Sequence, residues 1–106
     1  MKPRIRTAAM ILLATSLAAP AFAQSAGADT YKAKCAMCHG PDGTAATPMG
    51  KMMKIPSFKA PDQVKASEAS FIAITKEGKG KMPAYNGKLT DAQIKEVVSF
   101  IRTLQK

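Results

Sequence analysis

The sequence predicts an all-α fold, and three observations support this prediction. No stretch alternates apolar and polar residues for long enough to be typical of a β-strand. Apolar residues instead recur at helical spacing in three separate segments. Glycine and proline gather between those segments, in residues 40–62 and 78–89, where we expect loops. With 106 residues, the chain has room for one small domain.

The first 23 residues have the pattern of a secretory signal peptide rather than of this domain. The basic start MKPRIR is followed by an apolar run over residues 7–19 and then by AFA at residues 21–23, a small-x-small cleavage site. The apolar run is shorter than the roughly 20 residues that span a bilayer. We therefore predict cleavage after residue 23 rather than an uncleaved membrane anchor, and a mature domain of residues 24–106.

The expected mature domain is basic and small. The whole chain has 16 basic and 7 acidic residues, a formal net charge of +9. Removal of the signal peptide takes away three basic residues, which leaves 13 against 7, or +6. Domains of this size usually depend on a disulfide, a metal or a cofactor for stability. Export makes a disulfide possible, and both cysteines lie in one short stretch, residues 35–40.

The first helix is expected over residues 26–36, where it leads directly into the cysteines. Gly27 and Tyr31 are four residues apart, so they share one face of this helix. Because Gly27 has no side chain, another backbone could approach closely there.

The second and third helices carry clearer end signals. Residues 68–77 have an N-cap at Ser67 and a stop at Gly78. Residues 90–106 begin with a Thr-x-x-Gln capping box at Thr90. The apolar positions of this last helix form one stripe: Ile94, Val97, Val98, Ile101 and Leu104. Four polar residues lie off that stripe: Lys95, Glu96, Arg102 and Gln105.

The stretch CAMCHG at residues 35–40 contains both cysteines and the sole histidine of the chain. A Cys-x-x-Cys-His sequence is typical of the covalent attachment of a c-type haem. Two thiols three residues apart on a helical turn can add to the two vinyl groups of one haem. The imidazole of the next residue, His39, can then become an axial ligand of the iron.

Three other uses of these residues fit less well. A thioredoxin-like dithiol expects a βαβ context, which the sequence lacks. A zinc site needs four ligands, and the chain has no further cysteine or histidine. A disulfide between Cys35 and Cys38 would close so short a loop that it would stabilise little. We therefore expect one haem c, held by thioether bonds to Cys35 and Cys38 within three to four helices.

Three parts of the sequence resemble a class I (monohaem) cytochrome c of the short bacterial or photosynthetic periplasmic type. These parts are CAMCHGPDG, KMPAYNGKLTDAQI and the amphipathic C-terminal helix. The resemblance covers nearly all of residues 26–106. It implies a cytochrome c fold in which the N- and C-terminal helices cross. At that crossing, Gly27 and Tyr31 would meet Val97 and Phe100.

A single histidine rules out bis-histidine ligation within one chain, so methionines are the candidates for the second axial ligand. The expected mature domain contains five: Met37, Met49, Met52, Met53 and Met82. Met37 lies inside the attachment turn and cannot reach the opposite face of the haem. The resemblance selects Met82, which precedes Pro83 in a glycine-flanked loop, with Met52 or Met53 as the reserve. With both axial positions filled, no place remains for a substrate, which favours electron transfer over catalysis.

Hydrogen bonds around the two ligands can also be predicted. A ligating histidine usually donates its other ring N–H to an acceptor such as a backbone carbonyl, and we expect the carbonyl of Pro48 in this role. Tyr85 and Asn86 follow Met82 in the same loop and could bond a haem propionate or orient the sulfur. Simple packing of Tyr85 explains its presence equally well.

The function expected from these features is that of a soluble one-electron carrier, not an enzyme. We expect it in the periplasm, or in the thylakoid lumen if the organism is photosynthetic. Two alternatives are a haem-bearing subunit of a larger redox complex and a gas-binding or sensing haem protein with a labile Met82. Lysines lie near Met82 and in the first loop: Lys76, Lys79, Lys81, Lys88, Lys51, Lys54 and Lys59.

These lysines favour redox protein partners with acidic docking surfaces, because opposite charge raises the rate of encounter. Nucleic acid is a poor alternative, since exported chains seldom meet it. We expect the mature chain to be a monomer without stable membrane insertion.

Overall fold

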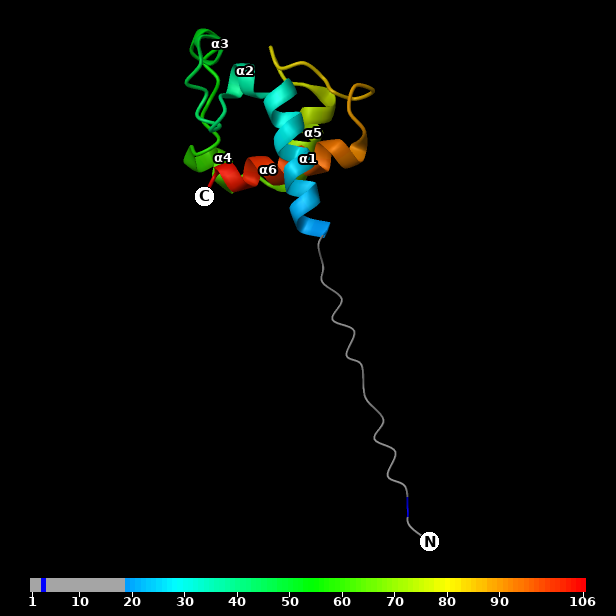
Figure 1. Ribbon diagram of the computed structural model, residues 1–106. Helices are drawn as coiled ribbons and strands as arrows, with labels where there is room; N and C mark the ends of the chain where they lie inside the picture. The colour runs from blue at the N-terminus through cyan, green and yellow to red at the C-terminus, as the bar shows by residue number, and fades with distance from the viewer. Residues whose placement is uncertain (1–2, 4–18) are drawn as a thin grey trace.

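The computed structural model describes residues 3 and 19–106, and this part of the chain contains six helices and no strand (Figure 1). Three helices have ten residues or more: α1 (Ala19–Lys34), α5 (Glu68–Glu77) and α6 (Asp91–Leu104). Three are short: α2 (Ala36–His39), α3 (Pro48–Met52) and α4 (Pro61–Lys65). The all-α prediction is confirmed, and the three long helices are the ones that the sequence predicts.

The first helix begins earlier than predicted, at Ala19 instead of residue 26. The predicted signal peptide, residues 1–23, lies mostly outside the described residues, so its cleavage stays a prediction. None of the helices in residues 19–106 is long and apolar enough to cross a membrane.

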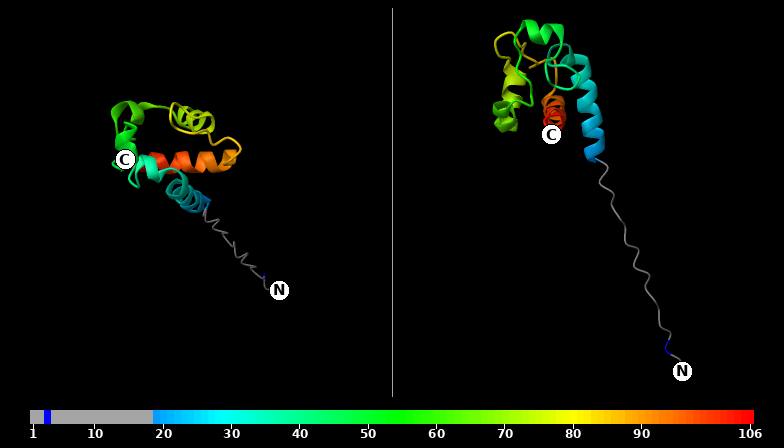
Figure 2. Two further views of the ribbon diagram at one scale, coloured as in Figure 1. Left: turned by 90° about the horizontal axis from the view of Figure 1, so that it is seen from above. Right: turned by 90° about the vertical axis from the view of Figure 1, so that its left-hand side faces the viewer.

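α1 crosses α6, and the contact between them depends on Gly27 (Figures 1 and 2). A Cβ atom at Gly27 would overlap the backbone carbonyl of Glu96 and would lie 3.2 Å from the Cβ of Phe100. The rings of Tyr31 and Phe100 pack beside it, with centroids 5.2 Å apart. Any larger residue at Gly27 would push the two helices apart. The predicted crossing of the first and last helices is confirmed, and so is the close approach that Gly27 allows.

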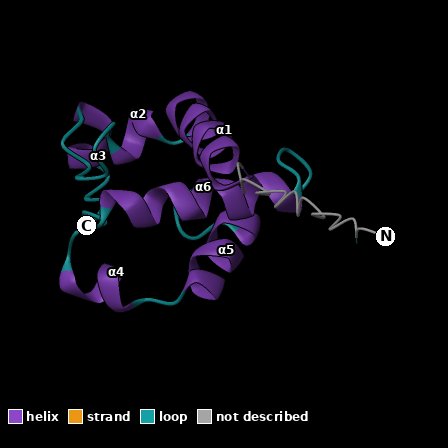
Figure 3. Ribbon diagram, turned by 60° about the horizontal axis from the view of Figure 1, so that its bottom comes forward, coloured by secondary structure: helices purple, strands orange, loops and turns teal. Residues whose placement is uncertain are grey.

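α6 lies at the centre of the fold, with α1, α2 and α3 on one side and α4 and α5 on the other (Figure 3). Four of the five residues in its apolar stripe are buried: Ile94, Val97, Val98 and Ile101. The core is completed by three aromatic residues from other parts of the chain: Tyr31, Phe58 and Phe71. The amphipathic pattern of the last helix therefore organises the packing of the domain.

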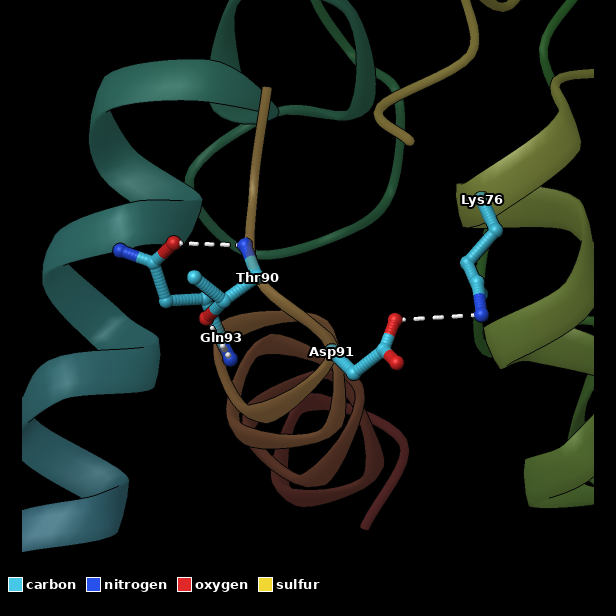
Figure 4. A network of polar contacts seen from close by, with 4 residues as sticks. All are labelled: Lys76, Thr90, Asp91 and Gln93. Atoms are coloured by element: carbon cyan, nitrogen blue, oxygen red, sulfur yellow. Dashed lines mark hydrogen bonds and ion pairs between the residues drawn. The ribbon is translucent and has the colours of Figure 1, made fainter. Parts of the chain in front are cut away.

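The start of α6 has the capping box that the sequence predicts (Figure 4). The amide of Gln93 donates to the Thr90 hydroxyl at 3.1 Å, and the Thr90 amide donates to the Gln93 side chain at 2.8 Å. An ion pair of 3.1 Å between Lys76 and Asp91 joins the end of α5 to this start. Because Asp91 is largely exposed, we assign the ion pair little stabilisation.

The expected loop over residues 40–62 is wrong for two stretches, which form α3 and α4. Each helix has a proline, Pro48 or Pro61, at its first position. Proline is tolerated there because its missing N–H would have no partner inside the helix. The hydroxyl of Thr47 caps α3 by accepting from the amide of Gly50 at 2.9 Å. The prolines of this segment therefore start helices as well as interrupting them.

Candidate functional site

The CAMCHG stretch forms the single turn of α2 directly after α1. The amides of Cys38 and His39 both donate to the carbonyl of Cys35, at 3.2 and 3.0 Å. Both cysteines are free thiols and half-buried. Residues three apart on a helical turn lie on one side of it, and His39 is the last residue of α2. This placement brings together three of the four residues predicted to hold the haem.

Burial keeps Cys35 and His39 uncharged. It raises the pKa of the Cys35 thiol to about 11, and the neighbouring Cys38 adds to the rise. A redox-active cysteine needs the opposite, a lowered pKa, so the dithiol interpretation is not favoured. Burial lowers the pKa of the His39 imidazole. The ring is then neutral at pH 7, which is the form that binds metal.

Two hydroxyl groups fix the backbone of the attachment turn. The Tyr31 hydroxyl donates to the carbonyl of Gly40 at 2.6 Å, within the core. The Thr47 hydroxyl donates to the carbonyl of Cys38 at 3.1 Å. Burial, with smaller contributions from nearby groups, raises the pKa of Tyr31, so its hydroxyl remains a donor. α1 and the start of α3 thus hold the turn from both sides.

The imidazole of His39 is positioned by an aromatic ring. It stacks on Phe58, with ring centroids 4.6 Å apart and an angle of 16° between the planes. Its Nδ1 atom is buried and has no hydrogen-bond partner among residues 19–106. The predicted bond to the carbonyl of Pro48 is therefore wrong. Pro48 is the first residue of α3, and the carbonyl of a first helical residue points along the helix toward the amide four residues later.

Met82 lies in a loop that folds back on the end of α5. The amides and carbonyls of Lys79 and Met82 bond to each other, at 3.1 and 3.0 Å. Gly78 precedes this turn with a φ of +75°, and a Cβ atom there would lie 2.7 Å from the Met82 carbonyl oxygen and 2.9 Å from the Ala84 nitrogen. Only glycine allows both this φ and this approach. The Met82 side chain is half-buried.

Tyr85 fastens the Met82 loop to the attachment region. Its hydroxyl donates at 3.0 Å to the carbonyl of Lys34, the residue before Cys35. Its amide donates at 3.0 Å to the carbonyl of Thr75 in α5. The sequence offers no signal for the first bond, because the partners lie 51 residues apart. The role of Tyr85 toward a propionate or the sulfur stays a prediction.

The remaining methionines occupy different environments. Met37 and Met52 are 76% and 72% exposed, so they are the most exposed large apolar side chains in the described residues. Met49 and Met53 are half-buried. The exposure of Met52 disfavours it as the reserve ligand.

Comparison with known proteins identifies the family. Residues 22–101 match the family described as cytochrome C oxidase, cbb3-type, subunit III. The chain is 36% identical to cytochrome c6 of Picosynechococcus sp., over 88% of this chain and 86% of that protein. The chain belongs to the class I c-type cytochromes. This c-type cytochrome is also 33% identical to cytochrome c6 of Synechococcus sp., over 87% of this chain and 81% of that protein.

A solved structure supports the same assignment. The fold is similar to that of the KustC0563 c-type cytochrome, with a TM-score of 0.70 and 29% identity over 76% of this chain and 98% of the other. As a monohaem c-type cytochrome, the protein is an electron carrier with one covalently bound haem c, and it is not an enzyme. The free thiols of one turn and the neutral imidazole beside them fit this group.

Proposed function

We propose that Cys35 and Cys38 form the thioether bonds to the haem and that His39 and Met82 are the axial ligands of its iron. One observation carries the choice of Met82. The Tyr85 hydroxyl bonds the carbonyl of the residue before Cys35, so the loop that presents Met82 is attached to the turn that presents the cysteines. The half-burial of Met82 supports the same choice.

The protein residues then have distinct roles in electron transfer. The bound haem supplies the one-electron change between ferrous and ferric iron. His39 and Met82 would hold the iron from the protein and so would exclude other ligands. A thioether ligand from Met82 would favour ferrous iron and so would raise the reduction potential. The backbone bonds that close the Met82 loop would limit movement of its thioether, and so would keep the rearrangement that accompanies each electron small.

The partners of this electron carrier are redox proteins, and we propose that they dock through acidic surfaces. Several lysines on and near the Met82 loop are exposed: Lys79, Lys81 and Lys88. Oppositely charged surfaces attract each other over the Debye length, about 10 Å at 0.1 M salt. The second-order rate constant of electron transfer with an acidic partner should therefore fall as salt rises. A rate constant independent of salt would contradict docking through acidic surfaces.

We further propose that the protein is exported to the periplasm, cleaved after residue 23 and monomeric. The leader pattern in residues 1–23 supports export. Mass spectrometry of the periplasmic fraction should show a chain that begins at Gln24 and carries the mass of one haem. Gel filtration should place it at the size of a monomer. A full-length chain, or elution within a larger complex, would contradict these assignments.

Met82→Ala tests the proposed ligand set. The variant should lose the weak sulfur-to-iron charge-transfer band of the ferric protein, show a lower reduction potential and bind carbon monoxide when reduced. The haem should stay attached through Cys35 and Cys38. Met52→Ala is the matched control, because this exposed methionine should leave all three properties unchanged.

Two results would overturn the proposal. Loss of the charge-transfer band in Met53→Ala, with the band retained in Met82→Ala, would make Met53 the ligand. Ready binding of carbon monoxide to the wild-type protein would show an open iron site and favour gas binding over electron transfer.

A further inference from the structure

A continuous line of contacts connects the C-terminal end of α6 to the imidazole of His39. The imidazole stacks on Phe58 at 4.6 Å. Phe58 in turn meets the edge of Phe71, with ring centroids 5.9 Å apart. The guanidinium carbon of Arg102 lies 4.8 Å from the centroid of the Phe71 ring, within the range of a cation–π interaction. The three aromatic groups and the guanidinium come from four separate parts of the chain.

Hydrogen bonds from the same end of α6 hold the backbone that carries Phe58. The Gln105 amide donates to the carbonyl of Phe58 at 3.0 Å and to that of Gln63 at 3.2 Å. The Arg102 guanidinium donates to the side-chain oxygen of Gln105 at 3.0 Å and to the carbonyl of Ala66. One of these polar residues lies in the last turn of α6 and the other directly follows it, and they connect the end of the helix to residues 58–66.

The stacked Phe58 ring is a contact that can orient the His39 imidazole. A ligating imidazole is usually oriented by a hydrogen bond from its second ring nitrogen. Here Nδ1 is buried without a hydrogen-bond partner in the described part of the chain. The outer torsion of a histidine side chain has broad preferences, so the backbone alone does not fix the ring plane. The nearly parallel Phe58 ring packs on the imidazole and so restricts its rotation.

We propose that Phe58 sets the orientation of the His39 imidazole plane, and that Gln105 and Arg102 are positioning residues that hold Phe58 and Phe71 in place. This inference rests on the proposed role of His39 as an iron ligand. It predicts an effect on the electronic structure of the iron rather than on haem attachment. In low-spin ferric haem, the plane of the axial imidazole directs the unpaired spin toward particular edges of the porphyrin.

The decisive measurement is the proton NMR spectrum of the ferric holoprotein. Phe58→Leu removes the ring plane but keeps an apolar side chain. It should change the order or the spread of the hyperfine-shifted haem methyl signals, while the charge-transfer band and the covalent haem remain. Phe100→Leu is the matched control, since Phe100 packs on Tyr31 at the helix crossing instead of on His39. Its methyl pattern should match the wild type.

Two variants at the end of α6 test the positioning residues. Gln105→Leu removes the bond to the Phe58 carbonyl, and because Gln105 is only half-buried we expect this variant to fold even if Phe58→Leu does not. Its methyl pattern should shift in the same sense as in Phe58→Leu, but less. Arg102→Met should also shift the pattern, and Arg102→Lys, which keeps the positive charge near Phe71, should restore part of it.

The possible outcomes separate the inference from the proposed function. A wild-type methyl pattern in both Phe58→Leu and Gln105→Leu would overturn the orienting role. Reduced stability of Gln105→Leu and Arg102→Met with unchanged methyl signals would make these residues merely structural and would also overturn it. A wild-type ferric spectrum without low-spin histidine–methionine ligation would instead contradict the proposed ligand set.

Discussion

The attachment turn and the Met82 loop are held in different ways, although both are proposed to supply a ligand to the same iron. The attachment turn, residues 35–40, is fixed by side chains from outside it, namely the hydroxyls of Tyr31 and Thr47 and the stacked ring of Phe58. The Met82 loop, residues 78–89, is held mainly by backbone bonds, within itself and to the end of α5, and one side chain, Tyr85, attaches it to the attachment region.

This difference indicates that the two ligands are held with unequal strength. Segments with few buried contacts open at a lower free energy than the rest of a domain. The His39 side should therefore open only when the whole domain unfolds, whereas the Met82 loop can detach by itself. Three substitutions test this comparison, each in one region and each with a distinct expected result.

The largest cost in free energy is expected for Gly78→Ala, in the Met82 loop. A non-glycine residue at a φ of +75° costs about 1–2 kcal/mol, and overlap with the Met82 and Ala84 backbones adds about 1–3 kcal/mol. We expect the ferric charge-transfer band to be lost, because the loop must open to relieve the overlap. Gly87→Ala is the control: Gly87 has a φ of +81° but an open space where its Cβ would lie. Equal effects in the two variants would show that backbone strain, not the close fold of the loop, is responsible.

A smaller effect on a different property is expected for Tyr31→Phe. The substitution leaves the carbonyl of Gly40 without its donor inside the core. Such a loss costs about 1–3 kcal/mol, which should appear as a lower midpoint of urea unfolding of the holoprotein. The charge-transfer band and the resistance to carbon monoxide should be unchanged, because the Met82 loop is not involved. If Tyr31→Phe instead bound carbon monoxide more readily and lost no stability, Tyr31 would act on the Met82 loop rather than on the attachment turn.

The parts of this structure that were predictable from sequence depend on local patterns. The residues on either side of α5, Ser67 and Gly78, define its bounds, and the structure has them at Glu68–Glu77 as expected. The capping box at Thr90 is equally local, because its partners are three residues apart. Helix caps and helical periodicity involve neighbours in sequence, so they are visible without the fold.

The contacts that complete the site are not local, and the sequence did not reveal them. Arg102 and Gln105 could be placed off the apolar stripe, but nothing in the pattern indicated that they bond the backbone of residues 58–66. The expected acceptor for His39, the Pro48 carbonyl, was wrong because the helical start at Pro48 was not recognised. The signal was present, since a threonine followed by proline is a favourable N-cap and first helical residue.

The smallest effect on stability is expected for Tyr85→Phe, the same chemical change as Tyr31→Phe in the other region. The bond from Tyr85 to Lys34 is exposed, so water can replace the lost donor and the free energy of unfolding should fall by less than about 1 kcal/mol. The loss should instead favour opening of the Met82 loop. A change of about 1 kcal/mol in that local equilibrium corresponds to roughly a fivefold change in the open population.

Imidazole added to the ferric protein can measure this population, because it binds iron only after Met82 has left. Its rate of binding should rise up to about fivefold in Tyr85→Phe and remain at the wild-type value in Tyr31→Phe. If Tyr85→Phe lowers the urea midpoint as much as Tyr31→Phe and leaves the imidazole rate unchanged, the loop is part of the same cooperative unit as the attachment turn. The inference that the two ligands are held with unequal strength would then be wrong.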